Sequence, residues 1–182
     1  MGFSNIIKKI SIFLMANFLI LLHLSWRIVF HQPMDLLNII MTVFLWLIIL
    51  NPRQKYIVIA TYTLLVCELF YTSPFGIESF AQISALLLAN WLLLSFFTNR
   101  SLIIIFFTSF ITMIVYRLIF IFLIYANSFI KTQPVEFSPL LLKMFFNEAL
   151  VTAITLSVIY IISSIFVKRL RPEYILETSR II

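Results

Sequence analysis

Glycine and cysteine are rare in this chain. Its 182 residues include only two glycines, Gly2 and Gly76, which lie far apart in the sequence. Phosphate-binding loops of the GxGxxG and GxxxxGK types need several clustered glycines, so nucleotide binding of those kinds is excluded. The single cysteine, Cys67, lies inside an apolar run and has no second cysteine with which to form a disulfide within the chain.

Charged residues are also scarce, at 11% of the chain against about 25% in average soluble proteins. Hydrophobic residues make up 63% of the chain, and the mean hydropathy is +1.11. A soluble domain of similar size buries only about 70% of its surface, so this composition would leave large apolar patches in contact with water. The composition therefore predicts a protein that lies in a lipid bilayer.

The common motifs of catalysis and metal binding are missing. Neither the HExxH zinc pattern nor the GxSxG elbow occurs, and His23 has no second ligand at metal-binding spacing, which favours a buried imidazole satisfied by its neighbours. The net charge is +6, but no basic run interleaved with aromatic residues could follow a phosphate backbone. We expect no enzymatic activity, no cofactor, no metal site and no nucleic-acid partner.

Six apolar runs, separated by polar breaks, have roughly the length of a membrane span. A bilayer core of about 30 Å needs about 20 residues at a rise of 1.5 Å each. The predicted spans cover residues 10–30, 34–50, 56–71, 77–97, 102–127 and 140–167, and residues 168–182 form a short basic tail. The second and third spans are short. The sequence thus predicts an all-α integral membrane protein, a single bundle of six transmembrane helices.

The distribution of basic residues predicts the orientation of this bundle, because Lys and Arg in short loops stay on the cytoplasmic side. With six spans and both termini inside, nine of the thirteen basic residues are cytoplasmic: Lys8, Lys9, Arg53, Lys55, Arg100, Lys168, Arg169, Arg171 and Arg180. Omitting either short span would destroy this alternation. The charge pattern therefore supports a multi-pass protein with both termini in the cytoplasm.

Three ionisable residues lie deep inside the predicted spans: Glu68 in the third, Arg117 in the fifth and Glu148 in the sixth. At helical rise, each lies about 18 to 22 Å above the cytoplasmic ends of the spans. Unpaired charge is costly in hydrocarbon, so we expect these three side chains to face the bundle interior and pair. One interpretation is an ion or proton relay or a substrate clamp. The interpretation that we favour is a structural pin between the three helices.

The fourth predicted span carries Ala81, Ala85 and Ala89 at four-residue spacing. Small residues at this spacing form one helix face, on which another backbone can approach closely. The face is expected to pack against a helix of the same chain. The alternative is that it binds the transmembrane helix of a partner protein.

A short turn is predicted between the third and fourth spans, in the stretch from Glu68 to Ser79. Pro74 prevents the preceding helix from continuing, and Gly76 permits the positive φ of a tight reversal. Thr72 and Ser73 can satisfy backbone groups at the helix end. The sequence therefore predicts a well-defined outer turn with Glu68 beneath it.

This turn resembles the rod shape-determining protein MreD, whose members carry an acidic residue followed by a small-residue, hydrophobic, glycine turn between two middle helices. The likeness extends to the basic turn at residues 97–101 and to six spans with cytoplasmic ends, and it is specific over the middle third of the chain. By position it implicates Glu68, Pro74, Phe75 and Gly76. It implies a fold similar to the substrate-binding subunits of energy-coupling-factor vitamin transporters, and a location in the bacterial inner membrane.

The resemblance implies a non-enzymatic scaffold of the cell-wall elongation machinery, with membrane lipid and MreC-like and RodA-like proteins as partners. The alternative hypothesis is the substrate-binding membrane subunit of a small-solute, vitamin-type transporter, with a pocket over Glu68 and Glu78. An intramembrane enzyme that uses paired glutamates is a third, less favoured class. A carrier predicts an outward cavity with converging polar groups, whereas a scaffold predicts a closed interior.

Overall fold

The computed structural model describes residues 3–31, 34–50, 54–95, 101–131 and 139–166. Every element in these ranges is helical: α1 (Phe3–Val29), the 3-10 helix η1 (Met34–Leu36), α2 (Ile39–Leu50), α3 (Gln54–Glu68), α4 (Ile77–Ser95), α5 (Leu102–Lys131) and α6 (Pro139–Phe166). The predicted all-α class is confirmed for this part of the chain. The predicted cytoplasmic tail, residues 168–182, lies outside the described residues.

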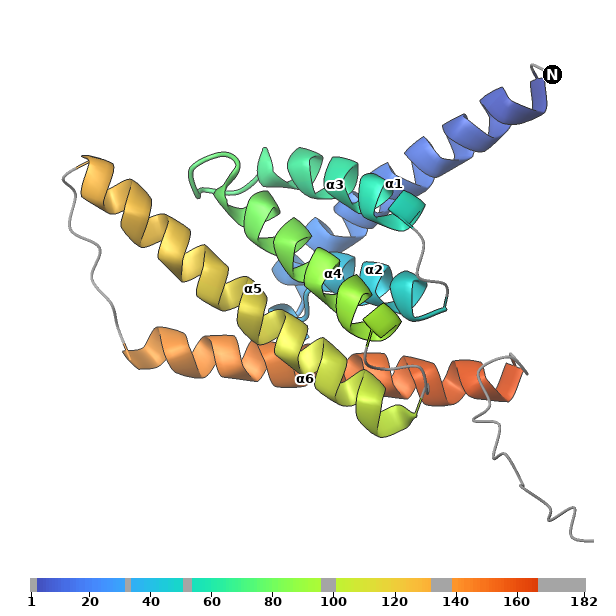
Figure 1. The fold of residues 1–182 in the computed structure, drawn as a ribbon. Helices are drawn as coiled ribbons and strands as arrows, with labels where there is room; N and C mark the ends of the chain where they lie inside the picture. Colours follow the sequence, from blue (N-terminus) through green and yellow to red (C-terminus); the bar gives the residue numbers. More distant parts are fainter. Residues whose placement is uncertain (1–2, 32–33, 51–53, 96–100, 132–138, 167–182) are drawn as a thin grey trace, which may run out of the picture.

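Successive α-helices run in alternating directions, so the start of α1 and the end of α6 lie at the same end of the bundle (Figure 1). The other end carries the turn between α3 and α4 (Figure 1). The longest helices, α5 and α6, pack against each other, and α4 packs on α5. We refer to the end that carries the α3–α4 turn as the turn end of the bundle.

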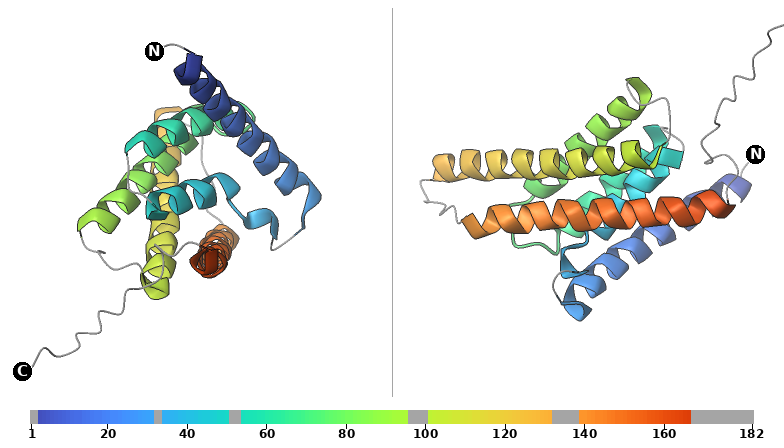
Figure 2. Two further views of the ribbon diagram at one scale, coloured as in Figure 1. Left: turned by 90° about the vertical axis from the view of Figure 1, so that its right-hand side faces the viewer. Right: turned by 90° about the horizontal axis from the view of Figure 1, so that it is seen from below.

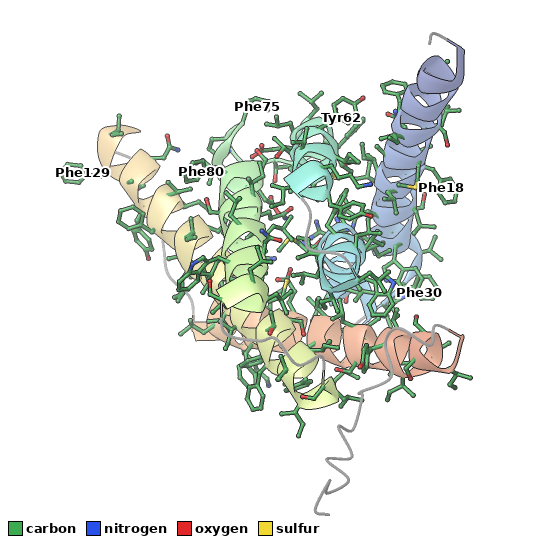
Figure 3. The ribbon with its side chains drawn as sticks, turned by 45° about the vertical axis from the view of Figure 1, so that its right-hand side comes forward. Phe18, Phe30, Tyr62, Phe75, Phe80 and Phe129 are labelled. Atoms are coloured by element: carbon green, nitrogen blue, oxygen red, sulfur yellow. The ribbon has the colours of Figure 1, made fainter. Side chains whose placement is uncertain are left out.

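Four helices contain stretches long and apolar enough to cross a membrane: Ile10–Val29, Ile77–Ser95, Leu102–Ile130 and Leu140–Ile165. Each carries large apolar side chains on its outer surface, and Phe18, Phe80 and Phe129 point away from the bundle in Figure 3. Such a surface is stable against lipid tails and unstable against water. The fold is therefore that of a multi-pass helical membrane protein.

The short helix α2 forms the centre of the bundle. It contacts α1, α3, α4 and α6, and Figure 2 (left) shows it surrounded by other helices. The buried residues of α2 include Phe44, Leu45 and Ile48, each with no exposed surface, and none of the exposed large apolar residues lies on it. This burial on all sides explains why its sequence is apolar around the whole circumference.

The second and third helices are shorter than the spans predicted from the sequence. The predicted span at 34–50 is divided because Asn38 caps α2: its side-chain oxygen accepts a hydrogen bond of 3.1 Å from the Met41 amide. The resulting α2 of 12 residues is about 18 Å long, less than a bilayer core of about 30 Å. Helix α3 ends at Glu68 rather than Tyr71. The count of six spans stays a prediction.

The alanine row of α4 lies inside the bundle. Ala81, Ala85 and Ala89 are fully buried, and α4 contacts α2, α3 and α5. Helices of the same chain therefore occupy this face, as the packing interpretation expects. A partner helix would have to displace one of them to reach it.

Replacing Ala85 with Leu should destabilise the bundle by about 1 to 3 kcal/mol, because three additional heavy atoms would have to fit into a filled interior. The measurement is thermal unfolding of the purified protein in detergent. Leu87 lies half-exposed on the same helix, so Leu87→Ala is the matched control and should have little effect. Equal stability of Ala85→Leu and the parent protein would contradict the tight packing of this face.

Candidate functional site

The α3–α4 turn is built from local backbone hydrogen bonds and one glycine. The amides of Leu69, Phe70 and Tyr71 donate back to carbonyls of the last turn of α3, over distances of 3.0 to 3.3 Å. Gly76 then has a φ of +95°, which side chains with a Cβ rarely adopt, and α4 begins at the next residue. Phe75 projects from this turn on the outer surface (Figure 3). The turn thus has the glycine-dependent reversal that the sequence predicted.

Glu68, the last residue of α3, caps the first turn of α4. Its carboxylate accepts a hydrogen bond of 2.8 Å from the Glu78 amide and a second, short one from the Ser79 hydroxyl. The first amides of a helix have no partner within the helix, and the helix dipole favours negative charge at this end. The buried carboxylate of Glu68 therefore holds α3 and α4 together across the turn.

Arg117 and Glu148 form an ion pair that joins α5 to α6. The Arg117 Nε atom donates to Glu148 Oε2 over 2.6 Å, and a second guanidinium nitrogen contacts the same oxygen. The guanidinium carbon also lies 4.5 and 4.6 Å from the ring centres of Tyr116 and Phe145. Rings at these distances stabilise a cation that is only 16% exposed.

The expected cluster of Glu68, Arg117 and Glu148 is therefore divided in two. Arg117 pairs with Glu148, while both Glu68 oxygens are bonded to α4. The physical reason is local, because the turn brings the unpaired amides of α4 directly to Glu68. Glu78 links the two parts, since its Oε1 accepts a hydrogen bond of 2.9 Å from the Tyr116 hydroxyl beside Arg117.

A polar cavity of about 200 Å³ lies beside the α3–α4 turn, with Tyr71 of the turn and Glu78 of the first turn of α4 in its lining. Six separate segments line it, from α1, η1 and the residues after it, the α3–α4 turn, α4, α5 and α6. The ionisable and polar residues of its lining are His23, Arg27, Asp35, Asn38, Tyr71, Glu78, Arg117 and Glu148. We call this feature the polar cavity.

Several polar groups of the cavity lack a partner among the described residues. The only ion pair in the described part of the chain is Arg117–Glu148, which leaves Arg27, Asp35 and Glu78 without a countercharge. His23 is 2% exposed, and its Nε2 lies 2.9 Å from the Tyr71 hydroxyl, whereas its Nδ1 has no partner. The expectation of a satisfied imidazole thus holds for one nitrogen only. Asp35 also has one buried, unpartnered oxygen.

The cavity is confined to one end of the bundle. Helix α2 starts beside it, one residue after Asn38, and runs away from it with Met41, Phe44 and Ile48 fully buried. No three His, Cys, Asp or Glu side chains in the described ranges lie in an arrangement that could hold a metal ion. Each segment that lines the cavity offers at least one hydrogen-bonding or charged group.

Of the residues that line the cavity, sequence reasoning identified Glu78, Arg117 and Glu148 as candidates but missed the rest. Arg27 and Asp35 flank a short loop, where charged residues are ordinary, and His23 had no ligand-type neighbour in sequence. Their convergence depends on how η1 packs against both α1 and α6. One sequence feature could have indicated this convergence: Arg27 and Asp35 carry opposite charges and lie near the facing ends of the first two predicted helices.

Replacing Glu148 with Gln should destabilise the protein by about 3 to 5 kcal/mol, because the buried Arg117 charge would lose its countercharge. Arg117→Met combined with Glu148→Met removes both charges and should recover much of that loss. Thermal unfolding in detergent of Arg117→Met, Glu148→Met and the double variant gives the coupling free energy. Additive effects would contradict a direct pair.

Replacing Glu68 with Ala should cost about 2 to 3 kcal/mol, because the Glu78 amide and the Ser79 hydroxyl both lose an acceptor. Glu68→Gln keeps one carbonyl oxygen and should cost about half as much. Hydrogen exchange of the first turn of α4 measures the effect locally. Unchanged exchange in Glu68→Ala would exclude the capping role.

Comparison of the chain with protein-family models, with curated proteins and with solved structures finds no match. The likeness of the α3–α4 turn to MreD therefore remains a resemblance in sequence. The geometric basis for a function consists of the apolar outer surface, the bonds that join the helices and the polar cavity.

Proposed function

We propose that this protein is a non-enzymatic integral membrane scaffold of the MreD type, which positions partner proteins during bacterial cell-wall elongation. The observation that carries the proposal is that the charged residues deep in the bundle join helices of the protein to one another. Glu68 joins α3 to α4, and Arg117 with Glu148 joins α5 to α6. Polar groups used in this way fix the relative positions of helices, and the apolar outer surface is left for lipid and for partner helices.

The proposal includes six spans in the bacterial inner membrane with both termini in the cytoplasm. The alternating directions of the helices accord with it, because the start of α1 and the end of α6 lie together (Figure 1). In this arrangement α2 is a short helix enclosed by its neighbours, and α3 is a short helix whose outer face, with Val58, Tyr62 and Leu65, is exposed to lipid. The turn end of the bundle then faces outward, and an MreC-like single-span protein and a RodA-like enzyme pack on its sides.

A second candidate is supported by the polar cavity. The substrate-binding subunits of energy-coupling-factor transporters, to which we propose a likeness in architecture, take solutes from the outer side. An outward cavity with several unpaired charges suits such a role. Its volume of about 200 Å³ is below the roughly 300 to 1,000 Å³ of typical small-molecule pockets, which favours the scaffold.

The scaffold is tested by affinity purification of the tagged full-length chain from its own cells in mild detergent, followed by mass spectrometry. The expected result is enrichment of a single-span protein with a periplasmic coiled coil and of the elongation glycosyltransferase. An unrelated multi-pass membrane protein with the same tag is the control. Depletion of the chain should also turn rod-shaped cells into rounded ones.

Two results together would overturn this proposal. In the first, the tagged chain co-purifies with the same proteins as the control. In the second, cell-wall elongation is unchanged after depletion of the chain. Uptake of a solute that is lost on depletion would then favour the transporter subunit.

A further inference from the structure

The charges of the polar cavity do not balance within the described residues. Arg117 and Glu148 neutralise each other. Arg27 remains as a cation without a carboxylate partner, and Asp35 and Glu78 remain as carboxylates without a cation. A space with unpaired charges of both signs is complementary to a molecule that also carries both signs.

The unpartnered atoms give the recognition its chemistry. The Arg27 guanidinium, which lies 5.9 Å from the centre of the Tyr71 ring, offers a planar set of N–H donors suited to phosphate or carboxylate oxygens. The free oxygen of Asp35 is an acceptor suited to the N–H donors of a protonated primary amine. The carboxylate of Glu78 accepts from the Tyr116 and Ser73 hydroxyls, but it has no cation beside it and can accept further hydrogen bonds. The buried Nδ1 of His23 is a further polar atom without a partner.

The size and position of the cavity restrict the ligand further. A volume of about 200 Å³ equals that of about seven water molecules, at roughly 30 Å³ each, so the part of a ligand that enters the cavity is small. Arg27 lies in the last turn of α1 and Asp35 in η1, so both lie at the ends of helices, where the headgroups of a surrounding bilayer are found.

We propose that the polar cavity binds a small zwitterion, with its phosphate or carboxylate at Arg27 and its protonated primary amine at Asp35 and Glu78. Two sources share this chemistry: the phosphoethanolamine headgroup of a membrane lipid, and a free amino-acid-like solute. The site does not depend on the scaffold role, because it rests on the cavity alone. A lipid headgroup would accompany a scaffold, and a free solute would accompany a transporter subunit.

The test uses the full-length protein in detergent, with the native lipid removed. Short-chain phosphatidylethanolamine, free phosphoethanolamine and free serine are titrated separately, and binding is measured by native mass spectrometry and by the shift in unfolding temperature. Phosphatidylcholine with the same chains is the matched control, because its quaternary amine has no N–H to donate. We expect at least tenfold tighter binding of one of the amine-bearing probes than of phosphatidylcholine.

Two variants locate the site. Arg27 is exposed and Asp35 only partly buried, so Arg27→Gln and Asp35→Asn should leave the fold intact. Each should weaken binding of the preferred probe about tenfold or more. Lys143 is exposed on α6 and does not line the cavity, so Lys143→Gln is the control and should bind like the parent protein.

The outcomes separate the two sources and the two proposals. Binding of phosphatidylethanolamine without binding of the free molecules assigns the lipid, and binding of phosphoethanolamine or serine assigns the solute. The inference is overturned if no amine-bearing probe binds, if phosphatidylcholine binds equally well, or if neither cavity variant weakens binding. None of these results changes which proteins co-purify with the chain, so the scaffold proposal succeeds or fails separately.

Discussion

The structure depends above all on placing a few charged groups inside an apolar bundle where each has a partner. In a medium of low dielectric constant, an unpaired charge costs several kcal/mol, whereas a paired one fixes the geometry of the elements that carry it. Arg117 and Glu148 do this for the two longest helices, and Glu68 does it for α3 and α4. The two attachments are linked through Tyr116 and Glu78.

Around this framework the packing follows from side-chain size and burial. The small residues of α4 let its neighbours approach closely, and the uniformly apolar α2 fills the centre that the longer helices enclose. Large apolar side chains then cover the outside, where lipid replaces water as the neighbour. Each long helix thus has one set of residues that faces lipid and another set that packs the interior.

The polar cavity differs from the rest of the interior because its charges are not all paired within the described residues. The other charged groups inside the bundle, Glu68 and the Arg117–Glu148 pair, are bonded to a helix end or to each other, whereas Arg27, Asp35 and Glu78 line the cavity without a countercharge. This difference between the deep charges and the three charges of the cavity is the basis of the proposed binding of a further polar molecule. This contrast connects the proposed scaffold and the proposed binding site within one bundle.

The sequence by itself determined the helical membrane class, the buried alanine row and the glycine reversal at Gly76, and four of its six predicted spans correspond to helices long and apolar enough to cross a membrane. These follow from composition, helical period and backbone stereochemistry, which are local properties. The tertiary structure alone decided that Glu68 bonds to α4 rather than to Arg117, that Asn38 shortens the second helix, and that His23, Arg27 and Asp35 converge. Convergence of distant segments depends on the angles at which helices pack, and no periodicity in one sequence records those angles.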